Sequence, residues 1–197
     1  ELFWENEENK DMNFVKEGAA SYFVENDKVN FTDEASAFNV ELQGELPCDT
    51  VFVDNTKDYT FSGTGAITGG ATLLKSGSGK LTISTDNTYT GGNRISGGVV
   101  SVSSLSNANQ AAGNLGGVTT SSSDFIIENG GELQTTAAVQ MGSPIQFVGQ
   151  EGGIINNSAD FAMNSAFSGT VLVKRGGGWL KTYSPGTNLE RMVITAG

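Results

Sequence analysis

Residues 69–98 read GGATLLKSGSGKLTISTDNTYTGGNRISGG, and this stretch decides the fold. Its short apolar pairs, such as Leu73 with Leu74 and Leu81 with Ile83, are separated by Gly, Ser, Asn and Thr at intervals too short for helices. Residues 172–197 repeat the stretch at a constant offset of 99 residues, without a gap over 26 positions. A repeat of fixed period predicts an architecture of stacked units.

The repeat resembles a known family motif. Leu-x-Lys-x-Gly-x-Gly-x-Leu-x-Ile from Leu73 to Ile83, followed by Asn-Thr-Tyr-Thr-Gly-Gly from Asn87, is similar to the autotransporter passenger-associated β-strand repeat. The second copy keeps Lys174-x-Gly-x-Gly-x-Leu180 but replaces the following six residues by Gly-Thr-Asn-Leu-Glu-Arg. The resemblance implies a bacterial secreted or cell-surface protein whose chain folds as a right-handed parallel β-helix.

Alternating apolar residues recur about every ten positions from residue 27 onwards. Val29 and Phe31 alternate with polar neighbours, and so do Val51 and Val53. This period of two indicates strands with one buried face, which would also suit an antiparallel sandwich or barrel. Two-residue hairpin turns are scarce, however, and Gly-Gly marks recur at multiples of 22 residues. We therefore expect a single all-β domain over residues 1–197, a parallel β-helix of roughly nine coils.

The remaining segments are predicted to be a cap, corners and a loop. Residues 1–26 mix aromatic and charged side chains and would cover the first coil, whose edge is otherwise unpaired. Residues 104–123 are small and polar, and we expect a protruding loop there, with a linker as the alternative. Glycine pairs would turn the corners, and left-handed backbone is expected at three asparagines, namely Asn55, Asn87 and Asn129.

The net charge of the chain lies entirely in its first third. Residues 1–60 hold 15 of the 22 acidic residues and four of the 11 basic ones, so they carry the whole net charge of −11. An acidic protein repels phosphate backbones, which argues against nucleic acid as a partner. The acidic third is interpreted as a solvated surface; the alternative, cation binding, lacks an acidic loop of calcium-binding spacing. No apolar run approaches the ~18–20 residues of a membrane span.

Several classes of site are excluded by composition. The chain has no histidine and a single cysteine, Cys48. It therefore lacks the residues for a Ser-His-Asp or Cys-His site and for ordinary structural zinc. Cys48 is interpreted as a small buried hydrophobe. We expect no catalytic residue, no metal site and no cofactor.

The alternative function is a carbohydrate-active β-helix enzyme, either a polysaccharide lyase or a glycoside hydrolase. A hydrolase needs convergent carboxylates, and a lyase needs a basic residue beside an acidic cleft. The carboxylates available for this are Asp33, Glu34, Asp54, Asp58 and Asp86, and the basic residues are Arg94, Lys174, Arg175 and Arg191. They share no spacing, so turns and surface are the simpler interpretation.

The second copy differs from the first in one strand. Trp179, Lys181 and Tyr183 alternate with Leu180 and should point outward, because Leu180 matches an inward Leu81. We interpret these three residues as candidate ligand-binding residues for sugar rings or for a protein; alternatively they cover a neighbouring coil. The sequence thus predicts a non-catalytic stalk or adhesive module, extracellular or on the outer cell surface, that contacts a glycan or a host or cell-surface protein.

Overall fold

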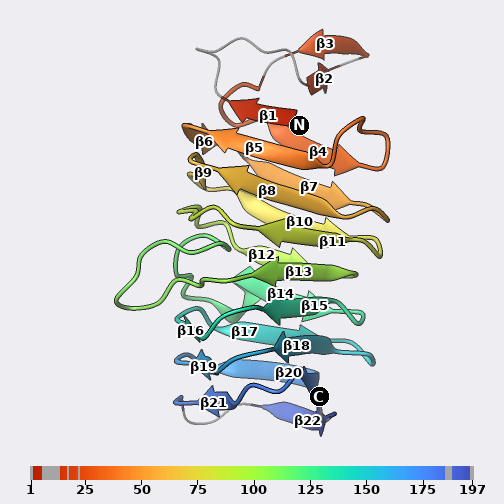
Figure 1. Cartoon of the computed structure of the whole chain (residues 1–197). Helices are drawn as coiled ribbons and strands as arrows, with labels where there is room; N and C mark the ends of the chain where they lie inside the picture. Colours follow the sequence, from red (N-terminus) through yellow and green to blue (C-terminus); the bar gives the residue numbers. More distant parts are fainter. Residues whose placement is uncertain (1, 6–13, 17, 22, 185–187, 196–197) are drawn as a thin grey trace.

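The computed structural model describes residues 2–5, 14–16, 18–21, 23–184 and 188–195. Its strands are stacked in one column, with the N-terminal strands at one end and β22 at the other (Figure 1). In this part of the chain every pairing between strands is parallel except that of the hairpin β2–β3 (Phe14–Lys16 and Ala19–Ser21). The structure is therefore the parallel β-solenoid expected from the sequence, and an antiparallel sandwich is ruled out.

The strands line three faces of the column. The first face is formed, in order along the column, by β1 (Leu2–Glu5), β5 (Asn39–Gln43), β8 (Tyr59–Gly63), β11 (Lys80–Ile83), β13 (Val99–Val102), β15 (Glu132–Thr135) and β18 (Gly153–Asn157). The second is formed by β4 (Lys28–Thr32), β7 (Thr50–Asp54), β10 (Thr72–Ser76), β12 (Asn93–Ile95), β14 (Phe125–Glu128) and β17 (Ile145–Val148). The long strand β20 (Phe167–Arg175) joins the two faces, and β22 (Leu189–Ile194) pairs with it.

The third face consists of two shorter sheets. One pairs β6 (Glu45–Pro47) with β9 (Ala66–Thr68), and the other stacks β16 (Val139–Met141), β19 (Phe161–Met163) and β21 (Leu180–Thr182). The described residues contain no α-helix, only one 3₁₀ turn at Ser122–Asp124. The three-stranded sheet β16–β19–β21 carries the candidate site.

The column has about seven turns, so the expectation of nine coils was too high. Paired residues on adjacent coils are mostly 19 to 22 positions apart, as for Leu81 with Val100 and Val29 with Val51. Where Asn93 pairs with Phe125 the separation is 32. Dividing the chain length by 22 overcounted the coils because the chain before β4 and the insertion before β14 add residues without adding turns.

Inward side chains form continuous rows along the column. Leu81 lies between Tyr59 and Val100 in one such row, and all three are fully buried. Each inward side chain contacts its counterparts in the coils above and below, while the backbone of the same strand hydrogen-bonds to both neighbours. The hydrophobic pattern of each coil therefore specifies the register of the next coil.

The glycines of the repeat mark corners where successive coils are in close contact. Gly77 and Gly176 have φ of 70° and 78°. A Cβ on Gly77 would overlap the carbonyl oxygen of Asn55, and one on Gly176 would overlap that of Asn157. Both copies thus place Lys-x-Gly-x-Gly against an asparagine one coil earlier.

The expectation of left-handed backbone was right for Asn129, whose φ is 51°, and wrong for Asn55 and Asn87. These two asparagines are buried and use their side chains instead. The amide of Asn55 donates to the carbonyl of Lys57, and the amide of Asn87 donates to Thr85 and Asn114. At a tight corner some backbone carbonyl groups have no backbone N–H partner. The buried side-chain amides donate hydrogen bonds to these carbonyls instead.

The two copies of the repeat occupy different pairs of faces. Lys75 ends a strand of the second face and is followed by β11 on the first. Lys174 ends the part of β20 on the first face, and the chain continues to β21 on the third. The offset of 99 residues between the copies is not a whole number of coils. The motif therefore specifies a corner with the two strands beside it, and this corner can lie between different pairs of faces.

Residues 103–118 lie between β13 and the 3₁₀ turn before β14 and project from the side of the column that carries the third face (Figure 1). Leu105 and Leu115 are buried, whereas residues 108–111 are exposed. The side-chain oxygen of Asn114 accepts hydrogen bonds from the backbone N–H groups of Ser103 and Ser104 at 2.8 and 2.9 Å. The base of this loop is thus tied to the column.

Aromatic rings fill the N-terminal end of the column. Trp4 in β1 is fully buried and contacts the rings of Phe23, Phe31 and Phe61, with centroid distances of 5.5 to 6.2 Å. Part of the segment expected to form a cap, residues 6–13, lies outside the described residues. The described part contributes β1 and the β2–β3 hairpin.

The buried row predicts the effect of a charge at position 81. Leu81→Asp would place a carboxylate among aliphatic side chains, and the free energy of unfolding should fall by about 3–5 kcal/mol, measured by chemical denaturation. Thr82→Asp, one residue further on an outward position, serves as the control and should stay within about 1 kcal/mol of wild type. Equal stability of the two variants would show that position 81 is not inward.

The corner contacts predict a matched pair of glycine substitutions. Gly77→Ala should lower the free energy of unfolding by more than about 1 kcal/mol, because its φ is left-handed and its Cβ would overlap Asn55. Gly70→Ala is the control, since no heavy atom lies within 4 Å of a Cβ built there. If thermal unfolding shows the same melting temperature for both variants, the close approach of coils at this corner is wrong.

Candidate functional site

The three residues predicted to bind a ligand lie together at the C-terminal end of the third face. Lys181 is the central, outward residue of β21, and Trp179 and Tyr183 flank that strand. Trp179 is 74% exposed and Tyr183 is 68% exposed. The neighbouring Leu180 packs against the core, as its match to Leu81 predicts. The alternation along this strand therefore turns all three candidate side chains toward solvent.

Lys181 is not a free cation. Its ammonium group forms an ion pair with the carboxylate of Asp160 at 2.5 Å. The hydrogen bond from Lys181 lowers the pKa of Asp160, and the same bond raises the pKa of Lys181. Both groups stay charged across the neutral range, and their charges compensate each other.

The outward residues of the three-stranded sheet form a small grid. Gln140, Ala162 and Lys181 are direct partners across β16, β19 and β21. Asp160 and Asn164 flank Ala162 on the same face of the chain, since side chains two residues apart point the same way. The Asn164 amide donates to the Gln140 side-chain oxygen at 3.4 Å. Sequence reasoning missed these partners, although the coil length of about 20 residues aligns them with Lys181.

Two hollows lie along this sheet. The first, about 430 Å³, is lined by Ala138, Val139, Gln140, Asp160, Ala162, Asn164, Lys181 and Tyr183. The second, about 420 Å³, lies between β16 and the loop, and its lining is Ser103, Ser104, Leu105, Asn107, Asn109, Gln110, Ala138, Val139 and Gln140. The two hollows adjoin, since residues 138–140 line both of them. We call the two together the third-face trough; Trp179 is not among the residues that line it.

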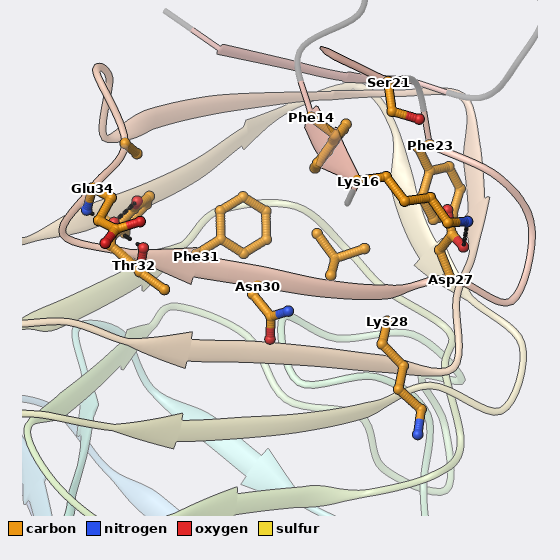
Figure 2. A pocket seen from close by; sticks show the side chains of 13 residues that line it. Phe14, Lys16, Ser21, Phe23, Asp27, Lys28, Asn30, Phe31, Thr32 and Glu34 are labelled. Carbon is orange, nitrogen blue, oxygen red and sulfur yellow. Dashed lines mark hydrogen bonds and ion pairs between the residues drawn. The ribbon is translucent and has the colours of Figure 1, made fainter. Parts of the chain in front are cut away.

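Another hollow, of about 530 Å³, lies beside β4 at the opposite end of the column (Figure 2). Figure 2 shows Asp27 paired with Lys16 at one end of it and Glu34 at the other, with the ring of Phe31 between them. A glycosidase needs two carboxylates flanking one bond. The described lining of this hollow therefore lacks the carboxylate arrangement of a hydrolase.

Three of the five carboxylates considered for catalysis hold turns between coils. Asp33 accepts hydrogen bonds from the Thr56 hydroxyl at 2.8 Å and from the backbone of Lys57 at 3.1 Å, and these bonds lower the pKa of Asp33. Asp58 accepts from the backbone N–H of Lys80 at 2.8 Å, and Asp86 from the hydroxyl of Ser104 at 3.0 Å. Each of these three carboxylates accepts a hydrogen bond from a residue one coil away, so its role is structural.

Two of the three arginines considered as bases, Arg94 and Arg175, are engaged in ion pairs. Arg94 contacts both oxygens of Glu128 at 2.7 and 2.8 Å, and Arg175 pairs with Glu132 at 3.4 Å. Arg191 lies on β22, in register with Val171. The charges of Arg94 and Arg175 are therefore compensated by carboxylates on the neighbouring coils.

The lysines of the two motif copies are buried. Lys174 donates to the carbonyls of Arg175 and Gly176 at 2.7 and 2.6 Å. Lys75 likewise donates to the carbonyls of Ser76 and Gly77, and burial lowers the pKa of Lys75 to about 8. Both ammonium groups cap corner carbonyls and are inaccessible to a substrate.

The cysteine and the acidic residues offer no other chemistry in the described part of the chain. Cys48 is buried, and burial raises the pKa of its thiol to about 12, so it is the inert hydrophobe expected from the sequence. No group of three or more Cys, Asp or Glu side chains among the described residues is arranged to hold a metal ion. Within the same residues, no helix is long and apolar enough to cross a bilayer.

Comparison with known proteins agrees with this architecture. Residues 73–102 match the model of the passenger-associated-transport-repeat. A curated relative, the adhesin BmaC autotransporter of Brucella suis biovar 1 (strain 1330), is 30% identical over 146 residues, which is 70% of this chain. The chain spans only 4% of the length of that relative. No solved structure matches.

The matched repeat begins at Leu73 in β10 and ends at Val102 in β13, so it contains the corner of Lys75 and Gly77 described above. The sequence resemblance is thereby confirmed in the segment that builds the column. This chain is a β-solenoid that carries the passenger repeat of the autotransporter family, and it is secreted or lies at the cell surface.

Proposed function

We propose that the chain is a rigid adhesive module whose contact surface is the outward face of β21, formed by Trp179, Lys181 and Tyr183. The observation that carries the proposal is the exposure of the two rings, 74% and 68%. Exposed aromatic rings flanking a single strand are a typical platform for sugar rings or for a protein surface. The partner is a glycan or a host or cell-surface protein.

The column itself supports a structural rather than a catalytic role. One outward row of the first face consists of uncharged polar residues over five coils, namely Thr60, Thr82, Ser101, Gln134 and Asn156. Such a row fits a solvated rod, and it contains no side chain that could serve as an acid or a base or that could activate its hydroxyl groups. The similarity to a protein named as an adhesin supports adhesion as the purpose of the rod.

The internal repeat supplies a matched control for the test. Trp179 and Tyr183 correspond to Lys80 and Ser84 in the first copy, where no aromatic ring is present. The test variant is Trp179→Ala/Tyr183→Ala, and the control variant is Lys80→Ala/Ser84→Ala. All four positions lie at the surface, so both variants should keep the wild-type melting temperature.

Binding to a glycan array and to host-cell surfaces is then measured for the three proteins. We expect the aromatic double variant to bind about tenfold more weakly than wild type, because flat rings supply most of the contact energy at such a surface. The control variant should bind like wild type. Identical profiles for all three proteins, or no binding by wild type, would contradict the proposal.

A further inference from the structure

We infer that the third-face trough is a binding site for an uncharged, hydroxyl-rich glycan chain that runs across the strands from Tyr183 to the loop at residues 103–110. The inference rests on the proposed function and names its ligand class and the full extent of its site. Three observations support it: the shape of the trough, the hydrogen bonds that hold the loop at its side, and the absence of net charge among its described lining residues.

The shape follows from the pairing register. Ala162 lies directly between Gln140 and Lys181 on neighbouring strands, so a short side chain separates two long ones. Ala138, which is exposed and lies two residues before Gln140, is also short. Small residues in the middle and long residues at the sides hollow out an otherwise flat sheet. The trough crosses three strands spaced ~4.8 Å apart and continues one coil further, to the loop.

The loop is a fixed wall of this trough. The backbone N–H of Gly142, the residue after β16, donates to the carbonyl of Ser106 at 2.9 Å, which ties the loop to the sheet. Asn114 holds the first loop residues from the other side through its contacts with Ser103 and Ser104. A site built on tied elements loses little conformational entropy when a ligand binds.

The lining is polar but carries no net charge. Among the described residues that line it, the charged side chains are those of Asp160 and Lys181, which form an ion pair with each other. The other polar groups are hydroxyls and side-chain amides, chiefly Gln140, Asn164, Asn107, Asn109 and Gln110. Amides both donate and accept hydrogen bonds, and so do the hydroxyl groups of sugars. Carboxylate, sulfate and phosphate groups would instead need an unpaired cation.

Tyr183 completes the site at its C-terminal end. It lines the trough and is 68% exposed, so its ring stands at the open end where a sugar can stack on it. Since the trough is open and shallow, each sugar unit contributes little, and affinity should rise with glycan length until the trough is filled. A peptide strand cannot add to the middle of the trough floor, because Ala162 lies on β19, whose two edges pair with β16 and β21.

The test uses the full chain and two variants inside the trough. Ala138→Trp places a large ring at the point shared by the two hollows, and Gln140→Ala removes a central amide. Ser84→Trp is the matched control, because it adds the same ring at an exposed position of the first copy. Thermal unfolding confirms that each variant keeps the wild-type fold.

Calorimetry is performed with neutral linear gluco-oligosaccharides and with oligogalacturonates of matched lengths. We expect wild type to bind the neutral series more tightly as length increases, and to bind the anionic series about tenfold more weakly. Ala138→Trp and Gln140→Ala should each weaken neutral binding about tenfold or more, whereas Ser84→Trp should not change it. Asp160→Asn, which releases Lys181, should reduce the preference for neutral over anionic chains.

The outcomes separate the inference from the proposed function. If the Trp179→Ala/Tyr183→Ala variant loses binding while Ala138→Trp and Gln140→Ala keep it, the trough is not the site and the aromatic platform remains. Equal or tighter binding of the anionic series overturns the ligand class. If wild type binds no neutral chain but binds a protein through this face, the glycan inference is wrong and adhesion stands.

Discussion

The structure depends on hydrogen bonding between coils in parallel register. Each interior strand of the first and second faces is paired on both edges by the strands one coil before and one coil after it, so like positions lie on top of one another along the column. Corners must bring backbone against backbone for this stacking to continue, which is why Gly77 and Gly176 have no room for a side chain. The same register that aligns Tyr59, Leu81 and Val100 inside also aligns Gln140, Ala162 and Lys181 outside. The candidate site is therefore a direct consequence of the fold.

Much of the architecture could be predicted from the sequence because period-two alternation and a gapless repeat are local signals. They identified the parallel column, the inward Leu81 and the outward strand of Trp179 and Tyr183. The number of coils was overestimated because chain length does not tell coil residues from the insertion at residues 103–118. Asn55 and Asn87 were placed in left-handed turns, since asparagine tolerates them, but their amides were needed inside the corners.

The candidate site was predicted only in part, because some of its residues come from coils that are distant in the sequence from the strand of Lys181. The strand of Lys181 was visible in the sequence, while Gln140 and Asp160 become relevant only through pairing register. The sequence does not show that Lys181 forms an ion pair with Asp160, and this pair is what favours uncharged ligands over acidic ones. Small residues such as Ala138 gave no sequence signal at all, although they leave the space that forms the trough.

The register across the third face is the claim on which both the fold and the site depend. It is tested by mild oxidation of paired cysteine variants, followed by mass analysis of the disulfide, with the buried Cys48 left in place. Gln140→Cys/Ala162→Cys joins direct partners, whose Cα atoms lie ~5 Å apart, within the range that a disulfide spans. In Gln140→Cys/Asp160→Cys the second cysteine is displaced by two residues along its strand, to ~8 Å, which exceeds that range. The account predicts rapid cross-linking of the first pair and little of the second; the reverse result, or equal cross-linking, would contradict it.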